Sequence, residues 1–127
     1  DLARHTQIKA ASVFGGVGMA PQVEALRDGV DIIVACPGGL LDHMQYDYAR
    51  FDDLEVLVLD EADRMLDMGF IPDIERIFKL TPFTRQTLFF SATMPPEIRD
   101  LADRILRNPT TVQIGMVAPA ETVSWCM

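Results

Sequence analysis

Short apolar runs rich in β-branched residues alternate with segments of helical period along the chain, and this alternation constrains the fold more than any other feature. The runs cover residues 11–14, 31–36, 54–60, 86–92 and 110–115. Apolar residues at helical spacing, with Pro in a first turn or Gly after a last turn, predict helices over 19–28, 37–45, 61–68, 72–80 and 95–106. Nearly continuous apolar strands separated by helices predict an α/β fold, with a parallel sheet that helices cover on both faces.

Charge and cysteine content restrict the class of protein. The 127 residues carry 19 acidic and 11 basic side chains, a net charge of −8. This balance disfavours a basic nucleic-acid-binding domain but leaves room for a local basic groove. Cys36 and Cys126 have no further candidate metal ligand near them, so we expect neither a disulfide framework nor a zinc site. No apolar stretch could span a bilayer, and we expect a cytoplasmic protein without a membrane partner.

Acidic and hydroxyl side chains follow two of the predicted strands. Asp60, Glu61 and Asp63 come directly after the run at 54–60, and Ser91 and Thr93 come at the end of the run at 86–92. Ligands gather at the carboxyl ends of the strands in an open parallel sheet. Clustered carboxylates need a cation, water or hydroxyl groups to offset their repulsion, and an apolar strand leading into an aspartate is typical of magnesium–nucleotide sites.

Four segments resemble motifs of one family. The sequence VLDEADRMLDMGF (58–70) and then LFFSATMP (88–95) resembles motifs II and III of the DEAD-box ATP-dependent RNA helicases. FGG (14–16) resembles the GG motif of that family, and Pro37-Gly38 followed by LLD resembles motif Ib. The resemblance runs from about residue 2 to residue 123 and has the character of bacterial RhlE-like members.

The resemblance implies a role for each matched residue. Asp60 would hold Mg²⁺ through water beside the ATP phosphates, and Glu61 would orient or deprotonate the attacking water. Asp63 would pair with the hydroxyl groups of Ser91 and Thr93 and so link the nucleotide state to RNA binding. Backbone at Gly15, Gly16, Pro37 and Gly38 would approach the RNA sugar-phosphate chain.

The chain also departs from the family pattern. Cys36 stands where the family usually has threonine and Gly39 where it has arginine, and both usual residues touch RNA phosphates. No phosphate loop of the form Gly-x-x-x-x-Gly-Lys-Ser/Thr occurs in the sequence. We therefore expect residues 1–115 to be the C-terminal part of the first RecA-like ATP-binding domain of a P-loop NTPase. Residues 116–127 would begin an interdomain linker or a divergent end, with a second RecA-like domain following in the same protein.

Three hypotheses follow for function. The first is a parent protein that hydrolyses ATP in an RNA-dependent reaction and unwinds short duplexes, with this segment inactive by itself. The second is a catalytically dead interaction module from a truncated helicase, suggested by Cys36 and Gly39. The third is another ATPase with a similar acidic motif, such as a DNA helicase.

Simpler interpretations exist for several residues. Asp60 and Glu61 could lie at an exposed helix N-terminus, and Ser91 and Thr93 could cap the helix that begins near Pro95. His5 and His43 are expected to be surface or loop residues, and Cys36 a small buried one.

Overall fold

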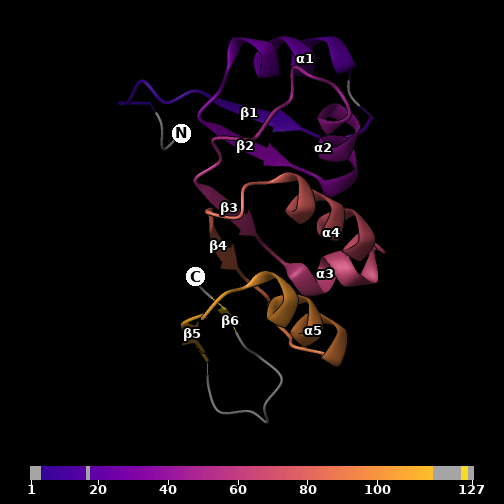
Figure 1. The fold of residues 1–127 in the computed structure, drawn as a ribbon, viewed down its shortest axis with the longest axis vertical. Helices are drawn as coiled ribbons and strands as arrows, with labels where there is room; N and C mark the ends of the chain where they lie inside the picture. Colours follow the sequence, from indigo (N-terminus) through magenta and orange to yellow (C-terminus); the bar gives the residue numbers. More distant parts are fainter. Residues whose placement is uncertain (1–3, 17, 116–123, 126–127) are drawn as a thin grey trace. The chain divides into compact units, whose positions relative to one another are not determined.

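The computed structural model describes residues 4–16, 18–115 and 124–125. The chain divides into two compact units, residues 1–50 and 51–127, and each is described separately (Figure 1). Among the helices of the described residues, none has both the length and the apolar character that crossing a bilayer requires.

The first unit contains two parallel strands, each followed by a helix. Its elements are β1 (Ala10–Val13), α1 (Met19–Asp28), β2 (Ile32–Ala35) and α2 (Pro37–Met44). β1 pairs with β2 in parallel, with Ala10 opposite Ile32 and Val13 opposite Ala35. Because α2 begins with proline at its first position, the chain passes directly from β2 into the helix.

The second unit repeats the alternation of strand and helix. Its elements are β3 (Val56–Leu59), α3 (Ala62–Asp67), α4 (Ile71–Leu80), β4 (Gln86–Phe89), α5 (Pro96–Ile105), β5 (Thr111–Val112) and β6 (Ser124–Trp125). β3 pairs with β4 in parallel, with Leu59 opposite Phe89, and the short β5 pairs with β6 in antiparallel orientation.

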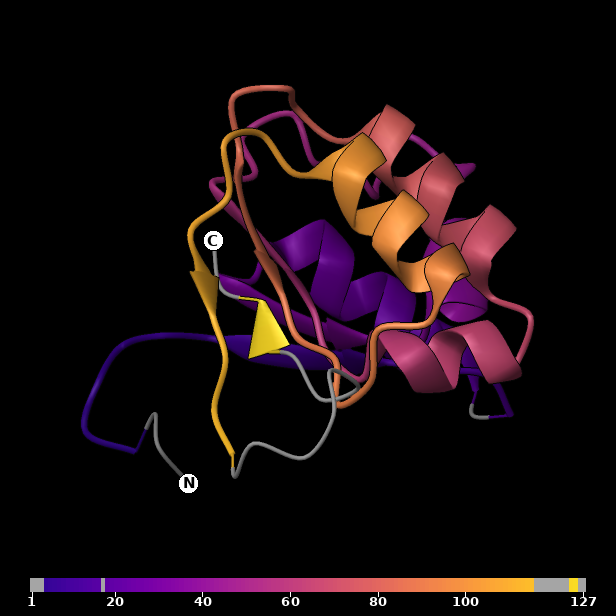
Figure 2. The ribbon, with the colours of Figure 1, turned by 90° about the horizontal axis from the view of Figure 1, so that it is seen from below.

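A single apolar core holds the second unit together. The apolar stripe predicted for the last helix is present, since Ile98 and Leu101 of α5 are fully buried and Ala102 is nearly so. These side chains pack with Phe89 of β4 and Ile74 of α4. Figures 1 and 2 show α3, α4 and α5 on the same side of the β3–β4 pair. The core therefore fixes the strand ends relative to the helices that follow them.

The α/β class with parallel strands is confirmed, and the predicted elements between residues 10 and 112 are present. Most are shorter than predicted, whereas β1 is shifted by one residue and α4 begins one residue earlier. The burial of the strands differs from the prediction. Alternate residues of the strands are exposed, with Val34 of β2 at 65% and Val58 of β3 at 51% of their accessible surface. In β1, β2 and β3, residues of one face are buried or half-buried and those of the other face are exposed.

The expected linker at 116–127 lies mostly outside the described residues. Within it the structure describes only residues 124 and 125, the strand β6. The assignment of residues 1–115 to part of a first RecA-like domain stays a prediction.

Candidate active site

The two polar segments predicted to meet do lie at the same edge of a strand pair. Asp60 follows the last residue of β3, and Ser91 lies two residues beyond the end of β4. The ladder between these parallel strands continues past their ends: the Phe90 N–H donates to the carbonyl of Leu59 (2.8 Å), and the Ala62 N–H donates to the carbonyl of Phe90 (3.1 Å). This backbone pairing places the acidic segment and the hydroxyl segment side by side.

Asp63 makes direct contact with the segment after β4. Its Oδ2 accepts hydrogen bonds from the Thr93 hydroxyl (2.9 Å) and the Thr93 N–H (3.1 Å). The Asp63 N–H donates to Ser91 Oγ (3.2 Å), and that hydroxyl donates to the Thr93 carbonyl (2.7 Å). Ser91 is only 4% exposed. The three residues therefore form one closed hydrogen-bonded network, hereafter the Asp63–Ser91–Thr93 network, which joins α3 to the end of β4.

The same network sets the protonation state of Asp63. Partial burial is the largest single effect and opposes ionisation, but hydrogen bonds from the Thr93 hydroxyl, the Arg64 N–H and the Thr93 N–H act in the other direction. Their combined effect is greater, so the pKa of Asp63 lies below its ordinary value. Asp63 is a carboxylate at neutral pH and is committed to Thr93.

Asp60 and Glu61 lie beside the network and are both exposed. The Glu61 N–H donates to Asp60 Oδ1 (2.9 Å), and the Glu61 carboxylate lies 3.6 Å from the Arg64 guanidinium. Glu61 has φ of 53° and ψ of 49°, the left-handed conformation that non-glycine residues rarely adopt. Backbone strain of this kind concentrates at functional sites.

The donor set fits a magnesium ion that water and phosphate oxygens largely surround. In the described ranges, no three His, Cys, Asp or Glu side chains converge on a point that could hold a metal. Asp60 Oδ2 has no hydrogen-bond or ion-pair partner there, since only Oδ1 is engaged. Mg²⁺ keeps several waters and commonly takes one or two protein carboxylates together with substrate phosphates. A single carboxylate at Asp60 is therefore sufficient for a metal that arrives with a nucleotide.

The candidate RNA-contacting residues lie in the first unit. Gly15 and Gly16 follow β1, and Pro37 and Gly38 open the helix that follows β2. Because β1 and β2 are parallel neighbours, both segments lie at their carboxyl ends. Gly16 has φ of +82°, so this turn requires a residue without a side chain.

Gly39 lies against this turn. A Cβ atom at position 39 would be 3.3 Å from the Cα of Phe14 and 3.5 Å from the Gly15 nitrogen. That spacing is tighter than ordinary van der Waals contact, so a larger residue would require the turn to move by a few tenths of an ångström. The glycine that departs from the family pattern thus packs directly on the turn at Phe14–Gly16.

A buried polar chain that the sequence did not reveal anchors the same turn. The Gln22 amide donates to the carbonyl of Phe14 (3.1 Å), and its Oε1 faces His43 Nε2 (2.9 Å). His43 Nδ1 lies 2.7 Å from the Tyr48 hydroxyl. Since Gln22 Oε1 can only accept, His43 carries its proton on Nε2 and accepts from Tyr48. Gln22 and His43 are 7% and 0% exposed, so both ring nitrogens of His43 find their partners inside the unit.

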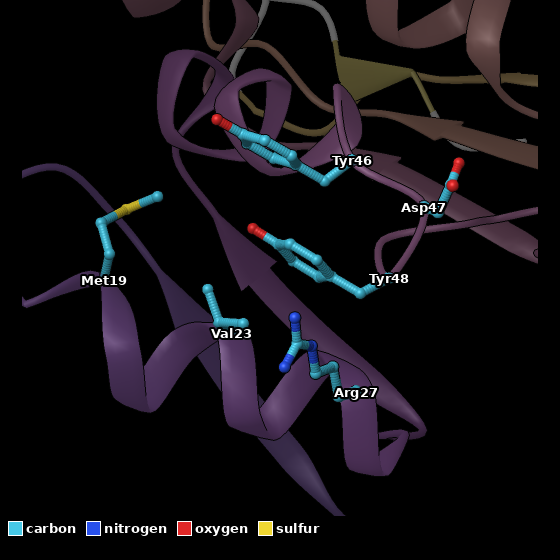
Figure 3. Close-up of a pocket in the computed structure, with 6 residues that line it drawn as sticks. All are labelled: Met19, Val23, Arg27, Tyr46, Asp47 and Tyr48. Carbon is cyan, nitrogen blue, oxygen red and sulfur yellow. The ribbon is translucent and has the colours of Figure 1, made fainter.

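Aromatic packing fixes the outer end of this chain. Tyr48 stacks on Tyr46 with ring centroids 5.6 Å apart, and the Arg27 guanidinium lies 5.5 Å from the Tyr48 ring centre (Figure 3). Met19 and Val23 of α1 complete the lining of this pocket. Tyr48 is therefore held between two neighbours, which directs its hydroxyl at His43.

Three of the simpler interpretations are wrong. His43 was expected at the surface or in a loop, but it is buried on α2 because two polar partners satisfy both ring nitrogens. Cys36 was expected to be buried, but it is exposed at the end of β2. No side chain caps α5, so the hydroxyl groups of Ser91 and Thr93 serve the network instead.

The sequence matches one known protein family over most of its length. The model of the DEAD/DEAH box helicases matches residues 1–101, and the chain belongs to that family. The chain is 45% identical over 114 residues to the DEAD-box ATP-dependent RNA helicase RhpA of Helicobacter pylori, covering 90% of this chain and 23% of that protein. It is 46% identical over 116 residues to the DEAD-box ATP-dependent RNA helicase 40 of Arabidopsis thaliana, covering 91% of this chain and 11% of that protein.

Solved structures of similar proteins have the same fold. A DEAD box protein from Methanococcus jannaschii superposes with a TM-score of 0.78 at 38% identity, over 82% of this chain and 28% of that one. A hypothetical ATP-dependent RNA helicase from Sulfolobus tokodaii gives 0.78 at 39%, over 84% and 32%. The predicted RecA-like α/β fold is confirmed, and the chain spans less than a quarter of the length of the curated relatives named above.

Proposed function

We propose that the protein containing this chain is an RNA-dependent ATPase that separates short RNA duplexes. One observation carries the proposal: the Asp63–Ser91–Thr93 network joins the ends of β3 and β4 directly beside the exposed pair Asp60 and Glu61. Membership of the DEAD/DEAH box helicase family supports it. The RhlE-like subtype and a cytoplasmic location remain predictions.

Asp60 and Glu61 have separate roles in the proposed hydrolysis. Asp60 would hold Mg²⁺ through water, and the metal would neutralise charge on the β- and γ-phosphates of ATP. Glu61 would orient the attacking water and accept its proton. The exposure of both carboxylates directly after β3 supports these roles, because a bound nucleotide could reach each of them. The reaction needs positioning and charge stabilisation, and no nucleophilic side chain is required.

Asp63, Ser91 and Thr93 would transmit the state of the nucleotide site. Asp63 lies two residues after Glu61 on the same short segment, and its carboxylate holds the loop that follows β4. A shift of the acidic segment during hydrolysis therefore moves this loop through defined hydrogen bonds. We assign these three residues to coupling rather than to chemistry.

RNA would bind in the first unit, along the turn at Gly15 and Gly16 and the helix start at Pro37 and Gly38. Both segments present backbone at the carboxyl ends of parallel strands, where phosphate and sugar contacts need close approach. Gly39 stands at the start of α2, where the family usually has an arginine, so we expect weaker RNA contact at this helix.

The chain as given would not complete the reaction. It contains no Gly-x-x-x-x-Gly-Lys-Ser/Thr loop to hold the ATP phosphates. A phosphate loop and a second RecA-like domain in the same protein would complete the ATP site, and we expect the 127 residues alone to be inactive.

Phosphate release and duplex separation, each measured with and without RNA, test this function in the protein that contains the chain. We expect Glu61→Gln to abolish RNA-stimulated phosphate release. We expect Ser91→Ala with Thr93→Ala to retain phosphate release and lose duplex separation. Equal loss of both activities in the Ser91/Thr93 variant would refute the coupling role. RNA-stimulated release by the isolated 127 residues that disappears in Glu61→Gln would refute the claim that they are inactive.

A second function, an interaction module without catalysis, is favoured by Gly39 and Cys36 in the RNA-contacting segment. The coding sequence next to Asp1 separates the two proposals. A lysine-containing phosphate loop upstream supports the enzyme, whereas a start codon adjacent to Asp1 supports the module. A third possibility, a DNA helicase, predicts that DNA stimulates phosphate release at least as well as RNA.

A further inference from the structure

A basic cavity lies at the other end of β4 from the Asp63–Ser91–Thr93 network. Gln86 and Thr87, which begin β4, line it together with the ends of α4 and α5 and the segments that follow them. Its volume is about 600 Å³, within the range of small-molecule sites. Four cationic side chains and no carboxylate line it: Lys79, Arg85, Arg104 and Arg107.

This concentration of positive charge is unusual for a chain with a net charge of −8. Two of the four cations have an ordinary explanation. Lys79 and Arg104 lie in the last turns of α4 and α5, where a cation complements the helix dipole, and Arg104 also pairs with Glu75. Arg85 and Arg107 lie outside the helices, and neither has a carboxylate partner in the part of the chain that the structure describes.

Arg85 and Arg107 face a shared electrostatic cost. Burial lowers the pKa of Arg85, and the nearby positive charge of Arg107 lowers it further. Arg85 Nε is buried without a hydrogen-bond partner, while Nη1 donates to the carbonyl of Pro82 (2.9 Å). Arg85 is half-buried and Arg107 is exposed, and an anion between two such neighbouring like charges would stabilise both.

The aromatic neighbours hold both guanidinium groups in place. Arg85 lies 4.7 Å from the ring centre of Phe78, and Arg107 lies 3.7 Å from that of Phe83 while it also donates to the Phe83 carbonyl. Arginine held over an aromatic ring keeps its remaining donors directed, which favours a planar or tetrahedral oxyanion. Phe83 is 74% exposed, so a ligand can reach this rim from solvent.

We infer that this cavity binds a phosphate group through Arg85 and Arg107, with Lys79 at its rim. The phosphate belongs either to a free small molecule or to the backbone of an RNA strand, and the same two arginines would hold it in both cases. The site is distinct from the proposed ATP site, because it lies where β4 begins and the other lies beyond where β4 ends. The inference does not depend on the proposed hydrolysis.

Amide chemical shifts of the 127-residue chain, followed during titration with inorganic phosphate, test the inference. Sodium chloride at matched ionic strength controls for screening. We expect saturable shifts at Thr81, Gln86 and Asn108, which line the cavity. Arg107→Gln should weaken binding about tenfold or more, because one charge-assisted hydrogen-bonding group is lost. Arg107→Lys should give an intermediate value, since it keeps the charge without the fork of donors.

Arg76→Gln is the matched control. It changes the net charge by the same amount as Arg107→Gln, and Arg76 is exposed on α4, outside the cavity lining. A short single-stranded RNA that shifts the same amides, with the same dependence on Arg107, assigns the phosphate to a strand backbone. Shifts with inorganic phosphate alone assign it to a small ligand. The inference is overturned if neither probe gives saturable shifts at these residues, or if Arg107→Gln and Arg76→Gln weaken binding equally.

Discussion

Removing the hydroxyl of Thr93 should destabilise the second unit through Asp63 alone. Thr93→Val keeps the shape of the side chain and deletes the 2.9 Å hydrogen bond to Asp63 Oδ2. The Thr93 N–H still donates to the same oxygen at 3.1 Å. A hydrogen bond to a charged group contributes about 1.5–3 kcal/mol when buried. Thr93 is exposed, so we expect the free energy of unfolding to fall by about 1 kcal/mol.

Asp63→Asn tests the other partner. The substitution removes the negative charge and brings an amide that donates toward the Thr93 donors. We expect a loss of about 1.5–2 kcal/mol, because two hydrogen bonds from Thr93 weaken together. In Asp63→Asn the Thr93 hydroxyl no longer has a carboxylate to donate to, so adding Thr93→Val removes little further stabilisation. The two effects should therefore overlap, with a coupling free energy of about 0.5–1 kcal/mol.

Urea unfolding of the four proteins, followed by far-ultraviolet circular dichroism, measures this coupling. Asp67→Asn and Thr84→Val are matched controls, since both residues are exposed in the same unit and outside the network. Each control should change the free energy of unfolding by less than about 0.5 kcal/mol. Strict additivity of Asp63→Asn and Thr93→Val would show that the hydrogen bonds of the network contribute no joint stabilisation, and the reasoning would fail.

Three further predictions concern the same two units. Asp63 has a lowered pKa in the folded state, so its carboxylate stabilises the fold fully above the unfolded-state pKa, and this stabilisation disappears as the pH falls through the folded-state pKa. When the free energy of unfolding is measured against pH, its decrease below about pH 4 should therefore be smaller for Asp63→Asn than for the native chain. His43→Leu leaves the buried Gln22 and the half-buried Tyr48 without their partner and should cost about 1–3 kcal/mol, and unchanged amide exchange at Gly15 and Gly16 would contradict the anchoring of that turn. Gly16→Ala should cost about 1 kcal/mol or more in urea unfolding because its φ is +82°, whereas Gly15→Ala, with open space around it, should be nearly neutral.

Local sequence patterns were sufficient to predict most of the fold. The apolar stripe at Ile98 and Leu101 follows directly from periodicity, because burial acts on one face of α5. The apolar run at 54–60 predicts a strand, which the structure has at Val56–Leu59, but the run also predicts burial of both faces, and Val58 is exposed. The meeting of Asp63 with Ser91 and Thr93 was also predictable, since parallel neighbouring strands end at the same edge.

The buried polar chain of the first unit could not be predicted in the same way. Gln22 and His43 are 21 positions apart, and each looks like a solvent-facing residue when its own helix is considered alone. Only the packing of α1 and α2 around Phe14 brings their polar atoms together. One weak signal was present, because Gln22 lies one helical turn before Leu26 and therefore shares its buried face.

Charge patterning was informative at the level of the whole chain and uninformative locally. The net charge of −8 leaves room for a local basic groove, but it does not indicate where one would lie. Arg85 and Arg107 are separated by the whole of β4 and α5, and they act on each other because that strand and helix return the chain to the same end of the unit.

The left-handed backbone at Glu61 has a consequence for how this protein can evolve or be engineered. Glycine or asparagine accepts that conformation at lower cost, so Glu61→Gly should make the fold more stable by roughly 1 kcal/mol. A screen that selects variants only for heat resistance should therefore enrich glycine at this position and discard the carboxylate. The variants that such a screen selects would be well folded but would lack the Glu61 carboxylate, the group proposed to activate water.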